Sequence, residues 1–200
     1  MITSPELEFR EYDHSFSYKS QGLVSVTNVL TSVGMIDFSH VPEQLLDRAK
    51  SRGSNVHLAC YLDDSNDLDF ENMDPGLKGY VMAWRKFRAD TGIVSFEFRE
   101  KPIGNVKMGL AGIPDCVALL TNKQWAVIEI KTNTVPAFAG HQLALYEVLL
   151  DKPCKRFAVA LKADGRPNVK EFKDRDDRGR ALGALAIHRW KVENGHLPKK

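Results

Sequence analysis

Three charged residues lie inside two apolar segments near the middle of the chain, and they constrain the fold more than any other feature. The segments span residues 113–120 and 124–131, and both are rich in β-branched and aliphatic residues. Asp115 lies in the first segment, and Glu129 and Lys131 lie in the second. A charge in a strand that otherwise forms part of the core is costly unless it is paired or bound to a metal. The sequence therefore predicts that these three groups share one site.

The two segments predict a β-hairpin whose loop length decides which side chains share a face. Residues 121–123 separate them. Because side chains alternate along a strand, Glu129 and Lys131 lie on the same face. A three-residue loop places Asp115 opposite Glu129, whereas a two-residue turn places them on opposite faces. A shared site therefore predicts an odd-numbered loop or a bulge.

Two carboxylates and an ammonium on one face form the outline of a site that hydrolyses phosphodiesters. Mg²⁺ takes oxygen ligands and is commonly held by one or two carboxylates together with substrate phosphates. A lysine beside the ion can orient or deprotonate an attacking water and offset the negative charge that develops. The pattern therefore indicates Asp115 and Glu129 as ligands of a divalent cation and Lys131 as a catalytic residue.

The order and spacing of these residues resemble the signature of the PD-(D/E)XK nuclease superfamily. Ile-Pro-Asp ends at Asp115, and after thirteen further residues the chain continues with Glu129, Ile130 and Lys131. The resemblance implies that Asp115, Glu129 and the backbone carbonyl of Ile130 bind Mg²⁺ or Mn²⁺. It also implies that Lys131 positions the attacking water.

Two further motifs resemble the RecB-like branch of this superfamily. Gln142 and Tyr146 match its QxxxY motif, and their four-residue spacing places them on one helix face. The resemblance implies that both contact DNA. Arg-Gly-x-x-x-His, which ends at His57, resembles an element whose histidine is a metal ligand. Taken alone, His57 is a partly buried helix histidine bonded to backbone or water; beside the other motifs, the ligand is favoured.

The strand predicted at residues 93–101 offers one more carboxylate. Glu97 and Glu100 are both candidates. In the family, an acidic residue often lies about one strand before the GxxD aspartate and helps to hold the metal or its water. Glu100 resembles this pattern better, and the alternative for each is a solvated strand carboxylate.

The composition of the chain further limits the class of protein and its partners. Two hundred residues, 43% hydrophobic and 27% charged, suit a single globular domain. The net charge of +2 does not exclude nucleic acid, because a local basic groove is sufficient. No apolar segment is long enough to span a bilayer, and the first residues lack a signal-peptide pattern, so we expect no membrane association and a cytoplasmic protein.

The three cysteines, Cys60, Cys116 and Cys154, are scattered along the chain. They fit reduced thiols better than a disulfide framework. Some RecB-like nucleases carry an iron–sulfur cluster on four cysteines. This chain departs from that pattern, so we expect no iron–sulfur cluster.

Hydrophobic periodicity and capping residues predict the remaining elements. Helices are expected at about 25–33, 42–61, 75–90, 136–150 and 174–193, and further strands at about 9–12, 16–18, 155–162 and 169–172. Asp74 followed by Pro75 favours a helix start, and Gly92 favours its end. The segment 104–109 is expected to be a turn.

These elements predict an α/β fold with a central mixed β-sheet of four or five strands flanked by helices. The resemblance implies a restriction-endonuclease-like core over about residues 24–172, within a single PD-(D/E)XK nuclease domain of residues 1–200 that ends in a helix at about 174–193. It implies a Mg²⁺- or Mn²⁺-dependent DNA exonuclease, similar to phage-borne members that act in recombination and repair in the bacterial cytosol.

Two alternative functions stay open. One is a structure-selective DNA endonuclease that uses the same site, and the other is a non-catalytic DNA-binding protein on a nuclease fold. DNA is the expected partner in each case, and a single-strand annealing protein is a further partner that the exonuclease role allows. No pattern in the sequence fixes the oligomeric state, the polarity of digestion or the preference for single or double strands.

Overall fold

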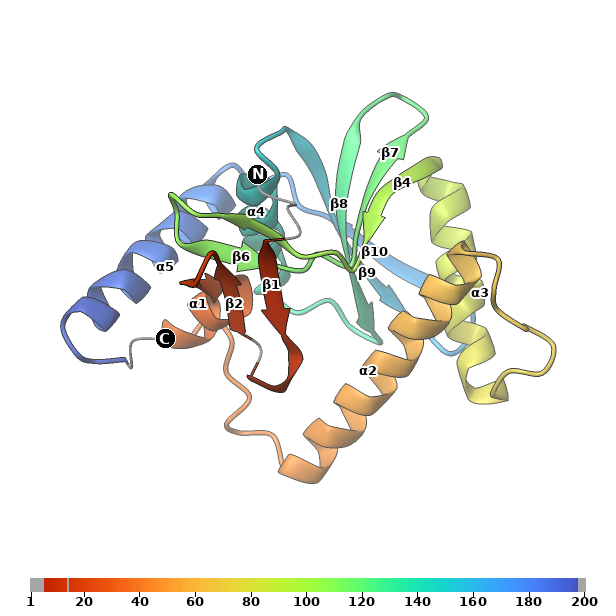
Figure 1. Ribbon diagram of the computed structural model, residues 1–200. Helices are drawn as coiled ribbons and strands as arrows, with labels where there is room; N and C mark the ends of the chain where they lie inside the picture. Colours follow the sequence, from red (N-terminus) through yellow and green to blue (C-terminus); the bar gives the residue numbers. More distant parts are fainter. Residues whose placement is uncertain (1–5, 14, 198–200) are drawn as a thin grey trace.

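Within residues 6–13 and 15–197, which a computed structural model describes, the chain forms two five-stranded sheets and five α-helices (Figure 1). The strands are β1 (Leu7–Arg10), β2 (Ser15–Tyr18), β3 (Gln21–Ser25), β4 (Ile93–Arg99), β5 (Ile103–Asn105), β6 (Leu110–Gly112), β7 (Cys116–Leu120), β8 (Trp125–Thr132), β9 (Cys154–Leu161) and β10 (Pro167–Glu171). The helices are α1 (Val26–Ser32), α2 (Glu43–Asp64), α3 (Pro75–Thr91), α4 (Ala139–Leu150) and α5 (Asp176–Glu193), with a short 3-10 helix η1 (Glu11–Asp13). The predicted α/β class is confirmed.

The sheet that carries the candidate site has the strand order β10-β9-β8-β7-β4, and we call it the central sheet. Its middle strand, β8, pairs antiparallel with β7 and parallel with β9, so the sheet is mixed, as predicted. The loop between β7 and β8 has the expected three residues, because the N–H of Leu120 donates to the carbonyl of Gln124 at 2.9 Å. The ladder that follows places Asp115, just before β7, opposite Glu129.

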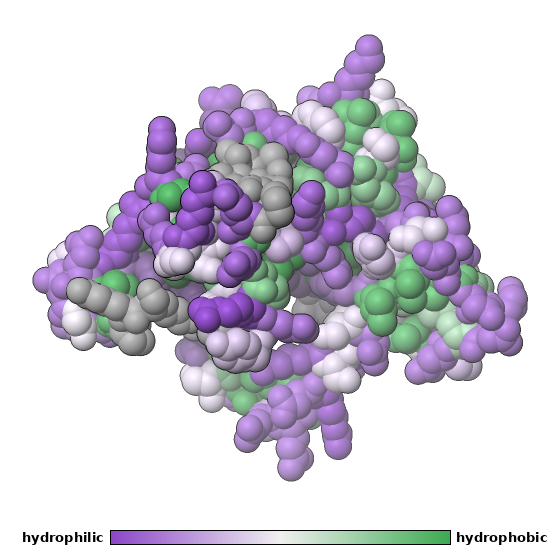
Figure 2. Space-filling model, viewed as in Figure 1, coloured by the Kyte–Doolittle hydropathy of each residue, from purple (hydrophilic) through white to green (hydrophobic). Residues whose placement is uncertain are grey.

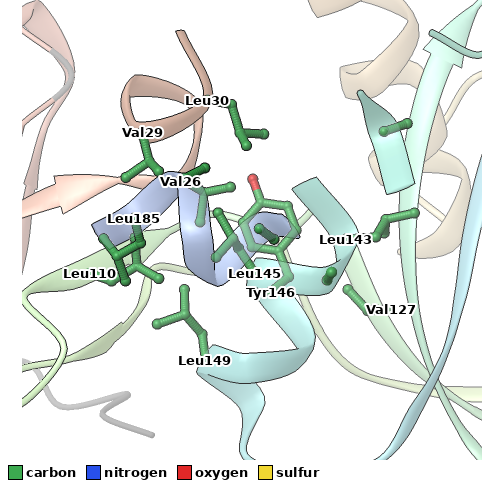
Figure 3. Packing of buried hydrophobic residues seen from close by; sticks show 14 of the residues in the cluster. Val26, Val29, Leu30, Leu110, Val127, Leu143, Leu145, Tyr146, Leu149 and Leu185 are labelled. Atoms are coloured by element: carbon green, nitrogen blue, oxygen red, sulfur yellow. The ribbon is translucent and has the colours of Figure 1, made fainter. Parts of the chain in front are cut away.

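Helices cover both faces of the central sheet (Figure 1). On one face, Val56 of α2 and Trp84 and Phe87 of α3 pack against Ile128 and Phe157 of the sheet. On the other face, α4 lies against β8 and β9 and also contacts α1 and α5. Figure 3 shows this second cluster, in which side chains of α4 meet those of α1, α5 and β6: Val26, Leu30, Leu110, Leu145, Leu149 and Leu185.

A second sheet, with the order β1-β2-β3-β6-β5, has no counterpart in the predicted fold, and we call it the N-terminal sheet. The sequence predicts one strand over residues 113–120, but the chain leaves the N-terminal sheet at Gly112 and enters the central sheet at Cys116. Pro114 lies between them and has no N–H to donate, so it cannot continue a ladder. The crossing places Asp115 where the two sheets meet.

The other strand predictions are confirmed where the strands are long or flanked by clear turns. The expected strands at about 93–101, 155–162 and 169–172 are β4, β9 and β10, and β1 and β2 lie near the two predicted at the start of the chain. The sequence misses β3, β5 and β6. Part of the segment 104–109, expected as a turn, belongs to β5. Three-residue strands such as β5 and β6 are too short to show an alternating pattern.

The predicted helix ends are confirmed to within three residues. The hydroxyl of Ser25 caps α1 by accepting from the N–H of Asn28 at 3.0 Å. The carboxylate of Asp74 caps α3 by accepting from the N–H of Gly76 at 2.8 Å, and Gly92 ends that helix at a φ of 69°. Among the described residues, no helix has the length and apolar character needed to cross a membrane.

Gly79 of α3 should not tolerate a methyl group, although alanine favours helices. A Cβ at Gly79 would lie 1.7 Å from the carbonyl oxygen of Ala163, and a backbone oxygen cannot move aside as a side chain can. We expect Gly79→Ala to lower the free energy of unfolding by about 1–3 kcal/mol or more. Gly53 of α2 is the matched control, because its Cβ would meet no atom within 4 Å. Gly53→Ala should raise the free energy of unfolding by about 0.5–1 kcal/mol. Urea unfolding curves that shift in the same direction for both variants would contradict the close contact between Gly79 and Ala163.

Candidate active site

The residues singled out from the sequence lie together where β7, β8 and the helices α2 and α4 meet. Asp115 precedes β7, and Glu129 and Lys131 occupy alternate positions of β8. Asp115 is 8% exposed and Glu129 is 4% exposed. Two carboxylates this deeply buried require specific partners.

Glu129 has partners on only one of its two carboxylate oxygens. Its Oε1 accepts hydrogen bonds from the ammonium of Lys131 and from the side-chain amide of Gln142, each at 2.8 Å. Its Oε2 is buried and accepts no hydrogen bond from the described residues. Burial and the nearby Asp115 raise the pKa of Glu129 to about 7, against the lowering effect of Lys131. A buried acceptor without a protein donor is a candidate ligand for a cation.

Asp115 is held between β8 and α2. Its Oδ2 accepts from the backbone N–H of Ile130 at 2.5 Å. Its Oδ1 lies 3.5 Å from Nδ1 of His57. The other ring nitrogen of His57 lies 3.2 Å from the carbonyl oxygen of Ile130. One imidazole therefore contacts both the aspartate and the carbonyl that were predicted as metal ligands.

Glu100 completes the ring of acceptors around His57. Its Oε1 lies 3.7 Å from Nδ1 of His57, and its backbone N–H donates to the carbonyl of Asp115 at 3.0 Å. Glu100 has a positive φ of 44°, a conformation that costs energy for a residue other than glycine. Burial lowers the pKa of His57, but Asp115, Glu100 and Glu129 outweigh burial and raise it to about 9. The imidazole is therefore a cation at neutral pH, surrounded by carboxylates.

The alternative carboxylate, Glu97, points elsewhere. It forms an ion pair with Lys152, away from the His57 cluster. The structure thus separates the two candidates that the sequence left open, and it places Glu100 at the site.

Gln142 and Tyr146 share one face of α4, as their spacing predicts, and both side chains are buried. Gln142 is 6% exposed and Tyr146 is 3% exposed, and the hydroxyl of Tyr146 donates to the carbonyl of Ile113 at 3.1 Å. Figure 3 shows Tyr146 inside the apolar cluster. The ring fits because position 112 is glycine: a Cβ at Gly112 would lie 2.7 Å from the Tyr146 ring. Gln142 donates to Glu129 and Tyr146 contacts Gln142, so both side chains can position that carboxylate, and the contact with DNA stays a prediction.

A pocket of about 480 Å³, lined by residues of β1 and α2 among others, opens onto the site. Asp115, His57 and Glu100 form its floor, and the N-terminal sheet and its 3-10 helix contribute Phe9 and Glu11. The remaining lining residues are Ser54, Leu58, Pro102 and Ile113. The sequence predicts a strand near Phe9 and Glu11, but no sequence pattern indicates that this segment lies beside Asp115.

Comparison with known proteins assigns no family. No family model matches the sequence, and no curated protein matches it. Nineteen chains of known structure match in the comparison of structures. One of them, SSO0001, is 17% identical and covers 86% of this chain and 79% of its own, with a TM-score of 0.39. A similarity this low carries no functional inference, so the function has to be argued from the site.

The acidic side chains of the site point at protein donors. Within residues 6–13 and 15–197, no three His, Cys, Asp or Glu side chains form a ready-made metal-binding group. Asp115 is directed at the N–H of Ile130, and one oxygen of Glu129 is directed at Lys131. A bound ion would therefore require some of these donors to exchange partners.

Proposed function

We propose that the protein is a metal-dependent deoxyribonuclease that hydrolyses phosphodiester bonds, acting as an exonuclease. The observation that carries the proposal is the buried Glu129, with Lys131 on one oxygen at 2.8 Å and no hydrogen-bond partner among the described residues on the other. Asp115 lies opposite it across the hairpin. This is the arrangement of two carboxylates and one ammonium that phosphoryl-transfer chemistry uses.

The donors present fit a hard divalent cation. Glu129 Oε2, Asp115, the Ile130 carbonyl, His57 and Glu100 would hold Mg²⁺ or Mn²⁺, and the histidine nitrogen favours Mn²⁺ slightly. When bound, such an ion lowers the pKa of a water and neutralises charge on the phosphate. Burial and Asp115 raise the pKa of Glu129, and a bound divalent ion would favour the charged form of this carboxylate.

Lys131, Gln142 and Tyr146 would carry out the steps that do not depend on the metal. The ammonium of Lys131, held by Glu129, would orient the attacking water and face the negative charge that develops on the phosphate. Gln142 donates to Glu129, and Tyr146 lies 3.4 Å from Gln142, so both keep the carboxylate in one orientation. Positioning of this kind accounts for a large share of enzymatic rate enhancement.

The same proposal includes the fold family of the core and the cellular role of the enzyme. The mixed sheet with α2 and α3 on one face and α4 on the other is compatible with a restriction-endonuclease-like core. A cytoplasmic role in recombination or repair, with a single-strand annealing protein as a partner, would suit such an enzyme. Mg²⁺ or Mn²⁺ is the proposed cofactor.

The experiment that tests the proposal is digestion of end-labelled linear duplex, single-stranded and closed circular DNA with Mg²⁺, Mn²⁺ or EDTA. We expect linear DNA to be digested only with metal, and Asp115→Ala to remove the activity. Glu97→Ala is the matched control, because Glu97 pairs with Lys152 away from the site, and it should digest DNA as the parent does. Cleavage of closed circles would establish the endonuclease instead. No metal-dependent cleavage of any substrate would reject the nuclease and favour a DNA-binding protein.

A further inference from the structure

One aromatic ring lies beside Lys131 and a second ring packs against the first, and neither belongs to the proposed metal-binding set. The ammonium of Lys131 is 5.9 Å from the ring centroid of Phe138, in the connection between β8 and α4. The ring of Phe38, in the connection between α1 and α2, meets Phe138 edge to face, with centroids 6.2 Å apart and an interplanar angle of 80°. Residues 100 positions apart in sequence thus form one aromatic pair next to the catalytic ammonium.

The pair is anchored on one side and open on the other. Phe138 is partly buried and packs against the apolar cluster under α4. Phe38 is 46% exposed. A single exposed phenylalanine is ordinary in a folded protein. This one differs because a second ring fixes its position and because that second ring lies against Lys131.

We propose that Phe38, supported by Phe138, stacks on a nucleobase next to the scissile phosphate, so that the strand enters the site with unpaired bases. The inference rests on the proposed function and specifies its substrate. A base is joined to its phosphate through one sugar, so a phosphate held at Lys131 has its base within reach of this pair. Stacking of a base on an aromatic ring tolerates any sequence, because each base has a π face. Bases inside a duplex are stacked on each other and are not free to use Phe38.

The pocket described above has a different lining. It presents the carboxylates of Glu11, Glu100 and Asp115 together with His57 and apolar side chains. Carboxylates repel a phosphate backbone unless a cation lies between them. The pocket therefore suits the metal, and the aromatic pair on the Lys131 side suits the bases.

The test measures binding without cleavage, by fluorescence anisotropy of a labelled oligothymidylate and of the same oligonucleotide made abasic. Ca²⁺ replaces Mg²⁺, and a parallel series contains EDTA. We expect Phe38→Ala to weaken binding of the oligothymidylate by about 5- to 100-fold and to leave binding of the abasic strand unchanged. Phe38→Leu keeps an apolar side chain without a π face and should behave like Phe38→Ala. Phe38→Trp should bind as tightly as the parent.

Met82→Ala is the matched surface control, because Met82 is 54% exposed on α3 and should not affect either strand. Equal binding by the parent and Phe38→Ala, equal losses on both strands, or no DNA binding at all would each overturn the inference. The proposed catalysis can fail separately. If the protein never cleaves DNA but binds bases through Phe38, the base-stacking inference holds and the nuclease proposal is rejected. If the protein is a metal-dependent nuclease whose DNA binding does not depend on Phe38, the nuclease proposal holds and the base-stacking inference is rejected.

Discussion

Replacing Lys131 by methionine should lower the rate of DNA cleavage by about 10²- to 10⁴-fold, because the variant loses the group that faces the developing charge and orients the water. Methionine keeps much of the aliphatic stem, so the loss isolates the ammonium. The measurement is single-turnover cleavage of linear DNA at saturating Mg²⁺, with binding measured in Ca²⁺. We expect binding to change far less than the rate.

This variant also removes a hydrogen-bond donor from the buried Glu129, so its stability needs a control. Lys131→Met alone leaves Glu129 with one donor, Gln142, and should lower the melting temperature. The double variant Glu129→Gln/Lys131→Met removes the unpaired charge, so it should regain melting temperature without regaining activity. A double variant that recovers cleavage, or a folded Lys131→Met that cleaves at the parental rate, would remove Lys131 from the mechanism.

The grouping of these three residues could be predicted from the sequence because the energetic penalty of a buried charge is large and local. Asp115, Glu129 and Lys131 interrupt apolar strands, and strand alternation together with the three-residue loop decides that the two carboxylates meet. The contacts of His57 could not be predicted from local sequence pattern alone. Its helix could be predicted, but its contact with Ile130, 73 positions later, depends on how α2 packs against the sheet.

The direction of the Gln142 and Tyr146 side chains could not be predicted, and the reason lies in α4. Ten of its twelve residues are buried, so the helix has no polar face that would indicate which side meets solvent. The four-residue spacing shows that both side chains share a face, and it does not show that this face is covered. A buried glutamine and tyrosine then act on the site through Glu129.

The N-terminal sheet could not be predicted because its decisive contact is non-local. β3 pairs in parallel with β6, and the register joins Val24 to Leu110. Neither strand exceeds five residues, and no turn connects them, so periodicity and turn signals are both absent. The consequence for function is direct, because this sheet brings Phe9 and Glu11 to the pocket above Asp115.

A second network, made of buried charged side chains, could not be predicted from sequence patterns. Breaking it should cause the largest change in stability. The carboxylate of Asp64, at the end of α2, is 4% exposed and contacts the guanidinium groups of Arg88 and Arg99. It also accepts from the indole N–H of Trp84 at 3.0 Å. Asp64→Ala would leave Arg99, whose side chain is 7% exposed, as a buried charge without its carboxylate partner. We expect a loss of about 3–5 kcal/mol in the free energy of unfolding, measured by urea denaturation.

Asp90→Ala is the matched control for this prediction. Asp90 also pairs with a cation, Lys86, but both side chains are more than half exposed. An exposed pair of this kind contributes about 0.3–0.5 kcal/mol, so the control should barely shift the unfolding curve. Similar losses in the two variants would show that burial does not decide the strength of the Asp64 contacts. The double variant Asp64→Leu/Arg99→Met, which removes both buried charges, should recover most of the stability.

The same network lies on the elements that carry His57 and Glu100, so we expect its loss to affect the site. His57 and Asp64 are seven residues apart on α2, about two turns, and therefore lie on the same side of the helix. Arg99, which holds Asp64, immediately precedes Glu100, which contacts His57. Freeing Asp64 from Arg99 loosens α2 against β4 at one end and should move His57 relative to Glu100 at the other. Folded Asp64→Ala should therefore bind Mn²⁺ more weakly than the parent in calorimetry, and unchanged Mn²⁺ affinity would show that α2 is held at His57 without this network.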